Sequence, residues 1–146
     1  MLSENTMTTC SSLDELLETF DLLDSWEERY QFLIDLGREV PPLPPEDITE
    51  ENRVQGCQSN VWLTTQVTDS IPPIIELAAQ SDAQVVKGLV AVLLLAYSGH
   101  TPEEILAFDI KDLFNKLGFT KHLSRSRSNG LFAMVQRVQN VSRGAL

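Results

Sequence analysis

Cys57 is the side chain whose residue type and setting most clearly invite chemistry. It follows Gly56, which permits a backbone turn that other residues resist, and it precedes Gln58, Ser59 and Asn60. A thiol at the tip of such a loop could act as a nucleophile, because the polar groups around it can donate hydrogen bonds to a thiolate or a persulfide. An isolated cysteine is, however, more often a small buried apolar residue. From spacing alone we favour that simpler interpretation.

The other reactive residue types form no catalytic pattern in the sequence. A cysteine hydrolase needs a histidine oriented by an asparagine or aspartate, whereas His100 follows a helix-ending glycine and His122 lies in a basic stretch. We expect both histidines to be solvated loop residues. Lys87 is expected on a helix surface rather than in a Schiff base, and neither GxGxxG nor a phosphate loop with GK[ST] occurs.

Much of the positive charge is gathered near the C-terminal end of the sequence. Lys121, Arg125, Arg127 and Arg143 belong to this group. In one interpretation, Arg125 and Arg127 cap and solvate the start of the last helix. In the other, one guanidinium lies near Cys57 and lowers the pKa of its thiol. The sequence leaves both interpretations open.

The elements that must position these residues are helices that precede and follow a small sheet along the chain. Apolar residues recur at helical spacing, with capping residues before them, at about 13–20, 25–39, 81–97, 101–108, 109–116 and 130–141. Ser12 or Ser11 is expected to cap the first helix, and Ser81 the third. Residues 121–128 are expected to form a basic loop.

Residues 61–67 and 74–78 are rich in β-branched and apolar side chains and predict an antiparallel hairpin. The proline-rich run 41–45 can continue neither a helix nor a strand ladder, so we expect a stiff connector there. A third strand is expected around Val54 or in that connector. The sequence therefore predicts an α+β fold: a small antiparallel sheet of about three strands, with helices packed on one face and Cys57 on a loop at the sheet's edge.

Length and composition indicate one globular domain. Of the 146 residues, we expect 1–12 to be a flexible N-terminus and 13–146 to be the single domain. No apolar run reaches the roughly 18–20 residues of a membrane-spanning helix, and no secretory signal is readable, so we expect a cytoplasmic protein without membrane contact. Cys10 and Cys57 are too few for a disulfide framework, and two histidines make a structural metal unexpected.

The sequence is strongly acidic. Twenty-one acidic residues against eleven basic ones give a formal charge of -10. A surface of that sign repels phosphate backbones, so nucleic-acid binding is disfavoured. The same charge predicts a partner with basic residues around the entrance to its active site. Binding of the two proteins should then weaken as the salt concentration rises.

Several separated motifs together resemble the SufE-type sulfur acceptors, the Fe–S metabolism-associated domain family that includes CsdE-like members. The segment 53–62, RVQGCQSNVW, is similar to the family's signature. Further similarities follow in the same order along the chain: 30–41, ending in LGREVP; 81–89, SDAQVVKGL; and 117–131, which contains HL and SRSNGL. The resemblance spans residues 23–138.

This resemblance implies a SufE/IscU-like fold and a sulfur relay. Cys57 corresponds to the cysteine that takes persulfide sulfur from a PLP-dependent cysteine desulfurase, activates that enzyme and passes the sulfur to a downstream Fe–S scaffold or other acceptor. PLP belongs to the desulfurase, and no bound cofactor is implied for this chain. Arg127 is implied to support the loop, and Asp82 to contact a partner or to hold the helix start. Gly56 and Gln58 flank the acceptor.

Three alternatives stay open beside the relay. A cysteine hydrolase would turn over esters or peptides without a partner. An adaptor using the proline-rich run 41–45 would bind its ligand even after Cys57→Ala. A scaffold that holds a cluster itself would be coloured when purified, although one matched cysteine is too few for the usual four ligands. Cys10 matches no motif of the family and is expected to be incidental.

Overall fold

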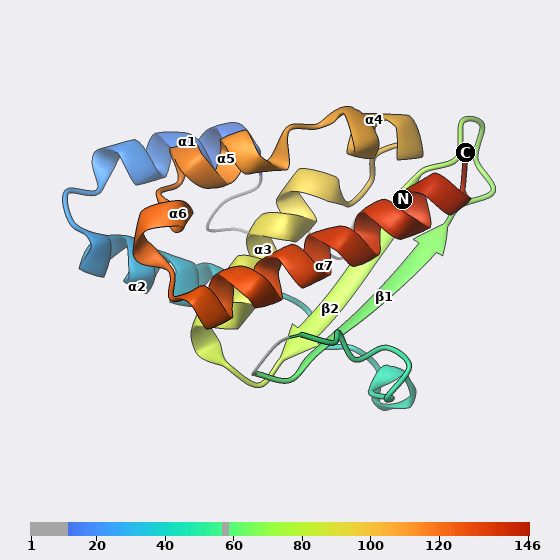
Figure 1. Ribbon diagram of the computed structural model, residues 1–146, viewed down its shortest axis with the longest axis horizontal. Coiled ribbons are helices and arrows are strands. Elements are labelled where there is room, and N and C mark those ends of the chain that lie inside the picture. Colours follow the sequence, from blue (N-terminus) through green and yellow to red (C-terminus); the bar gives the residue numbers. More distant parts are fainter. Residues whose placement is uncertain (1–11, 57–58) are drawn as a thin grey trace.

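A computed structural model describes residues 12–56 and 59–146 of the protein. Its elements are α1 (Leu13–Leu22), α2 (Trp26–Gly37), the 3-10 helix η1 (Pro45–Asp47), β1 (Val61–Val67), β2 (Ile75–Ser81), α3 (Gln84–Tyr97), α4 (Pro102–Ala107), α5 (Ile110–Lys116), α6 (Phe119–His122) and α7 (Arg125–Gly144). Helices precede and follow one hairpin, as Figure 1 shows, so the predicted α+β class is confirmed. The expected flexible start and Cys10 fall on 1–11, outside the described residues.

Local capping explains where the first helices begin. Ser12 Oγ accepts a hydrogen bond from Glu15 N at 3.2 Å, which confirms the cap predicted for α1. Ser25 and Glu28 form a reciprocal capping box at the start of α2. Each cap satisfies backbone N–H groups that have no partner within the helix.

The sheet consists of two strands within the described residues. β1 and β2 pair antiparallel from Val61↔Ser81 to Val67↔Ile75. The third strand expected around Val54 is present only as a bridge between Arg53 and Trp62. The chain approaches this bridge from the proline-rich connector and η1, so it pairs with β1 over too short a length to form a strand.

Ser81 is not the helix cap that the sequence predicts. It is the last residue of β2, and α3 begins three residues later with Ala83 as its N-cap. The inward alternation of Ile75, Leu77 and Ala79 continues to Ser81, which is buried. Pairing and burial of Ser81 in β2 are therefore more favourable than its use as the N-cap of α3.

The predicted basic loop at 121–128 is also wrong. Lys121 lies in α6, and α7 begins at Arg125, five residues before the predicted start. Ser124 caps α7 by accepting a hydrogen bond from Arg127 N at 3.2 Å. Gly130, expected at the helix start, is instead a buried position inside the helix.

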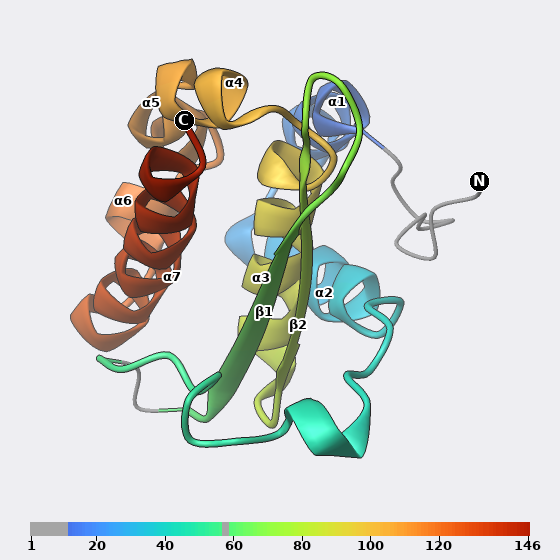
Figure 2. The same cartoon turned by 90° about the vertical axis from the view of Figure 1, so that its right-hand side faces the viewer.

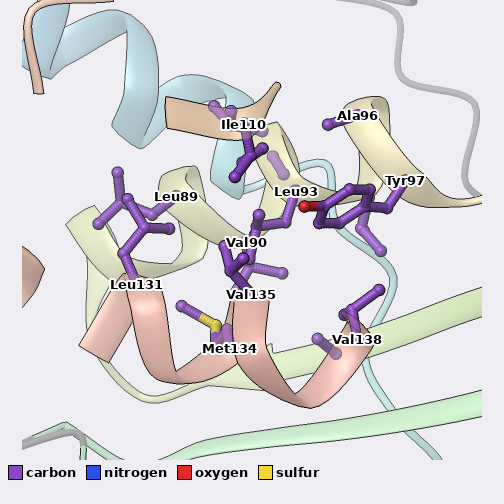
Figure 3. Packing of buried hydrophobic residues seen from close by; sticks show 14 of the residues in the cluster. Leu89, Val90, Leu93, Ala96, Tyr97, Ile110, Leu131, Met134, Val135 and Val138 are labelled. Carbon is purple, nitrogen blue, oxygen red and sulfur yellow. The ribbon is translucent and has the colours of Figure 1, made fainter. Parts of the chain in front are cut away.

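The core is built around α3. Its side chains are buried along nearly the whole helix and pack against α7, as Figure 3 shows for Leu89 with Leu131 and for Val90 with Val135. In Figure 2, α3 runs behind the two strands, with α7 on one side and α2 on the other. Val61, Leu63, Ile75 and Leu77 are buried, so the sheet presents an apolar face to the helices. The described residues include no helix that is both long and apolar enough to span a membrane.

Two glycines let α2 and α3 cross closely. A Cβ on Gly88 would lie 2.3 Å from the Leu33 carbonyl oxygen, and one on Gly37 would lie 2.6 Å from Gly88 N. Both distances are shorter than any real Cβ contact. This crossing fixes the position of α3 against α2.

Candidate functional site

The segment around Cys57 is a loop whose two ends are joined at the edge of the sheet. Val54 N donates to the Val61 carbonyl oxygen at 2.8 Å, and both side chains are buried. Gln55 and Gly56 follow this closed base on one side, and Ser59 and Asn60 precede β1 on the other (Figure 1). Cys57 and Gln58 themselves lie outside the described residues, while Gly56 and Ser59 flank them. The described flanks of Cys57 therefore lie at one end of β1.

Asp82 holds the end of the loop that enters β1. Its carboxylate accepts hydrogen bonds from Asn60 N at 3.2 Å and from Asn60 Nδ2 at 2.9 Å. Asn60's carbonyl oxygen in turn accepts from Asp82 N at 3.3 Å and from Ser81 Oγ at 2.8 Å. The aspartate singled out by the sequence thus contacts the loop three residues after Cys57. We refer to this set of bonds as the Asp82–Asn60 clamp.

Arg137 holds the other end of the loop from α7. Its guanidinium donates to the Arg53 carbonyl oxygen at 3.1 Å and to the Glu51 carbonyl oxygen. Both acceptors lie just before Val54, so one side chain ties the N-terminal flank of the loop to the long C-terminal helix. A planar guanidinium suits this pairing, because its fork presents two donors at once.

Gly56 adopts a left-handed backbone turn of the kind that glycine permits. Its φ is +92°, a left-handed value that side chains disfavour. A Cβ at Gly56 would lie 3.5 Å from the Ala133 side chain, so the loop approaches α7 there. This turn leads the chain directly into Cys57.

A pocket of about 280 Å³ lies beside the loop. Loop residue Ser59 and helix residue Arg127 both line it, together with a mixed set of apolar and hydroxyl side chains: Val86, Leu89, Ser124, Ser126, Gly130, Leu131 and Met134. Arg127 makes no ion pair with any described residue. The structure therefore brings Arg127 to the pocket that adjoins the cysteine loop, and Asp82 to the base of the same loop.

The other candidate residues stay away from this pocket. His100 lies 3.5 Å from Glu104 at the start of α4, and His122 stacks on Trp26 with 4.3 Å between ring centroids. Neither histidine lines the pocket, nor does Lys87. Within 12–56 and 59–146, no group of three or more His, Cys, Asp or Glu side chains could hold a metal ion. The described site thus offers a cation, hydroxyl groups and apolar walls.

The proline-rich connector is partly built into the fold. Leu43 is buried, and its N–H donates to Gln80 Oε1 at 2.8 Å. A ligand for a proline-binding domain needs an extended, accessible segment. Burial of Leu43 therefore weighs against the adaptor interpretation.

Sequence reasoning missed Arg137 and Ala133. Arg137 bonds to backbone carbonyl groups 84 and 86 residues away along the chain. Every residue has a backbone carbonyl group, so the sequence cannot show which of them an arginine will bind. From sequence alone, an arginine within a helix is expected to be solvated. Ala133 is a small residue that packs against Gly56, and no sequence pattern indicates that contact.

Comparison with known proteins agrees with this architecture. The family model described as SufE, the Fe–S metabolism associated domain, matches residues 14–142. An uncharacterized SufE-like protein of Rhizobium meliloti is 43% identical over 137 residues, covering 93% of this chain and 98% of that protein. An uncharacterized SufE-like protein of Rhizobium etli is 45% identical over 130 residues, 88% of each chain.

A solved structure supports the same assignment. The solution structure of a hypothetical protein from Thermus thermophilus superposes with a TM-score of 0.72 at 28% identity, covering 91% of this chain and 94% of that one. The family match covers nearly the whole chain, and it includes the loop, the Asp82–Asn60 clamp and the Arg127 pocket. This protein belongs to the SufE family of Fe–S metabolism associated domains.

Proposed function

We propose that this protein accepts sulfur on Cys57 from a PLP-dependent cysteine desulfurase and stimulates that enzyme. It then passes the sulfur to a downstream acceptor in Fe–S cluster assembly or a related transfer pathway. The observation that carries the proposal is the loop itself: 55–60 has one cysteine, and Asp82, Arg137 and the Val54–Val61 pairing hold both of its ends. Family membership points to the same chemistry.

The transfer is an exchange between thiols with no net redox change. The Cys57 thiolate attacks the terminal sulfur of the persulfide on the desulfurase cysteine. A new S–S bond forms on Cys57, the donor's S–S bond breaks, and the donor cysteine leaves as a thiolate. Delivery repeats the step, since an acceptor thiolate attacks the terminal sulfur on Cys57. PLP stays with the desulfurase, and this chain needs no cofactor of its own.

The neighbouring residues have supporting roles in this proposal. Arg127 favours the thiolate form of Cys57 by placing a positive charge beside the loop, and Gly56 permits the turn that presents the thiol. Gln58 is a candidate hydrogen-bond donor to the sulfur. Asp82 limits the movement of the loop, so that a persulfide is sheltered from oxidants between partners.

Desulfurase stimulation tests the proposal. Alanine production by the cognate desulfurase should rise when the wild-type protein is added and should not rise with Cys57→Ser. Cys10→Ser is the matched control and should stimulate like the wild type. Equal stimulation by Cys57→Ser would show that the protein activates without accepting sulfur, which contradicts the relay.

Arg127 is tested separately through the reactivity of the thiol. In Arg127→Ala, the alkylation rate of Cys57 should reach half its maximum at higher pH than in the wild type. Arg143→Ala removes the same charge near the far end of α7 and should leave the profile unchanged. Identical profiles and desulfurase stimulation in wild type and Arg127→Ala would leave Arg127 with a structural role only.

A further inference from the structure

Charge is strongly segregated along this chain despite its net value of -10. The segment 12–52, which contains α1, α2 and η1, holds thirteen acidic and two basic residues. No acidic side chain occurs in 113–146, where six basic ones do: Lys116, Lys121, Arg125, Arg127, Arg137 and Arg143. The protein therefore has an acidic N-terminal part and a basic C-terminal part. The net charge therefore does not describe the surface of α6 and of the start of α7.

The basic residues on α6 and in the first turn of α7 are available to a partner. Lys121 on α6 and Arg125 and Arg127 in the first turn of α7 are exposed. None of the three is ion-paired with a described residue. Arg127 lines the pocket that Ser59 also lines, so this positive charge adjoins the loop.

One exposed face of α7 begins at Arg125. Arg125, Asn129, Phe132 and Gln136 are spaced four, three and four residues apart and are all exposed, so they lie on one side of the helix. Phe132 keeps 38% of its surface exposed although its ring packs edge-to-face against Phe114. An exposed aromatic side chain beside unpaired cations is typical of protein interfaces, where aromatic residues and arginine are enriched.

We infer that Lys121, Arg125 and Phe132 form a docking surface, next to the pocket that Arg127 lines, for an acidic patch on the protein that delivers sulfur to Cys57. This inference rests on the proposed function. It replaces the expectation of a basic partner, which followed from net charge alone. Charge complementarity brings the partner's acidic groups against the first turn of α7, and Phe132 supplies an apolar contact. The acidic α1–α2 region then favours this orientation, because it repels the same patch.

A protein fits this surface better than a nucleic acid does. The cations are few, and an apolar ring lies among them. The thirteen acidic residues of 12–52 repel a phosphate backbone that extends beyond the immediate contact. A compact acidic patch on a folded partner avoids that repulsion.

Charge reversal at one position, with a matched reversal on the same helix, tests the inference. Arg125→Glu places an acid in the first turn of α7, where the helix dipole favours it, so the fold should persist. Arg143→Glu makes the same charge change about 27 Å away along the helix. The dissociation constant for the cognate desulfurase should rise about fivefold to tenfold in Arg125→Glu at about 0.05 M salt, and this difference should shrink at about 0.5 M. Arg143→Glu should change it less than about twofold.

Each remaining outcome separates the possibilities. Equal affinities of wild type, Arg125→Glu and Arg143→Glu would overturn the docking surface. If Cys57 still gained sulfur, the proposed function would stand. If the wild type gained no sulfur at saturating desulfurase, the proposed function would fail whatever the affinities. Binding of a labelled single-stranded RNA at about 0.15 M salt that Arg125→Glu abolishes, or a wild-type dimer that it dissociates, would assign the surface to another occupant.

Discussion

Replacing Asp82 with alanine should loosen the end of the cysteine loop that enters β1. The carboxylate accepts two hydrogen bonds from Asn60, at 3.2 and 2.9 Å, and alanine removes both. Two other bonds to the Asn60 carbonyl oxygen, from Asp82 N and Ser81 Oγ, do not depend on the carboxylate. The loop end should therefore open more often without being released.

The size of this effect follows from the exposure of the clamp. A hydrogen bond to a charged group contributes about 1.5–3 kcal/mol where water is excluded. Asp82 and Asn60 are both exposed, which lowers the contribution to about 0.5–1 kcal/mol for each bond. The two bonds together stabilise the closed loop end by about 1–2 kcal/mol, a factor of about 5–30 in the opening equilibrium.

Amide hydrogen exchange measures this opening directly. Exchange at Asn60 N–H should accelerate by about 5–30-fold in Asp82→Ala, and Asp82→Asn should fall between, because its amide oxygen can still accept one of the bonds. Glu103→Ala removes an exposed acid from the first turn of α4 and should leave Asn60 unchanged. An unchanged rate in Asp82→Ala, or an equal change in Glu103→Ala, would refute the clamp.

Further predictions concern the packing and the second tie of the loop. Gly88→Ala should lower the free energy of unfolding by about 3 kcal/mol in urea titrations, because the added Cβ would clash with the Leu33 carbonyl oxygen and push α2 away from α3. Gly144→Ala is the control and should not be destabilised, because a Cβ there would have no atom within 4 Å. Tyr97→Phe should be neutral or should stabilise by up to about 1 kcal/mol, because Tyr97 Oη is buried with no hydrogen-bond partner among the described residues. Burial raises the pKa of Tyr97 above its ordinary 10.0, and this outweighs the smaller lowering of that pKa by the Gln139 side chain, which makes no well-formed hydrogen bond to Oη. The neutral phenol therefore favours folding. Its contribution to stability should be complete below about pH 10 and should be lost above it, together with a late rise in phenolate absorbance. Arg137→Met should lower the free energy of unfolding by about 1–2 kcal/mol and should raise the rate of Cys57 alkylation, because both bonds to the loop base are lost. Arg137→Lys lacks the planar guanidinium, so its stability and alkylation rate should stay close to those of Arg137→Met.

Local signals in the sequence predict the parts of the fold that depend on neighbouring residues. The helix predicted at 25–39 begins where expected, after Ser25, which forms a capping box with Glu28. The predicted hairpin is confirmed. The β-branched and apolar residues of its two strands specify which face of the sheet is buried. The central position of α3 follows from its nearly continuous apolar surface.

The errors arise where one residue type serves two structures. Serine caps helices and also ends strands, so Ser81 is ambiguous until the depth of the sheet is known. Glycine likewise occurs at helix starts and inside helices, so Gly130 predicts a start although α7 begins five residues earlier, after the Ser124 cap. The length of pairing around Val54 depends on where the connector approaches the sheet, and no local pattern records that.

The site divides in the same way. The motif around Cys57 and the left-handed turn at Gly56 are local and can be predicted. The approach of Arg127 to the loop and the hydrogen bonds of Arg137 to Arg53 and Glu51 are tertiary contacts. They depend on how α7 lies across the sheet, which the sequence does not reveal.

Intact-mass measurement after mixing with desulfurase, PLP and cysteine tests the central claim most directly. The wild-type protein should gain the mass of one sulfur atom, and fragmentation should place it on Cys57. Cys10→Ser should gain the same mass, and Cys57→Ser should gain none. No gain with the cognate desulfurase, or an equal gain in Cys57→Ser, would contradict the proposal that Cys57 carries the sulfur.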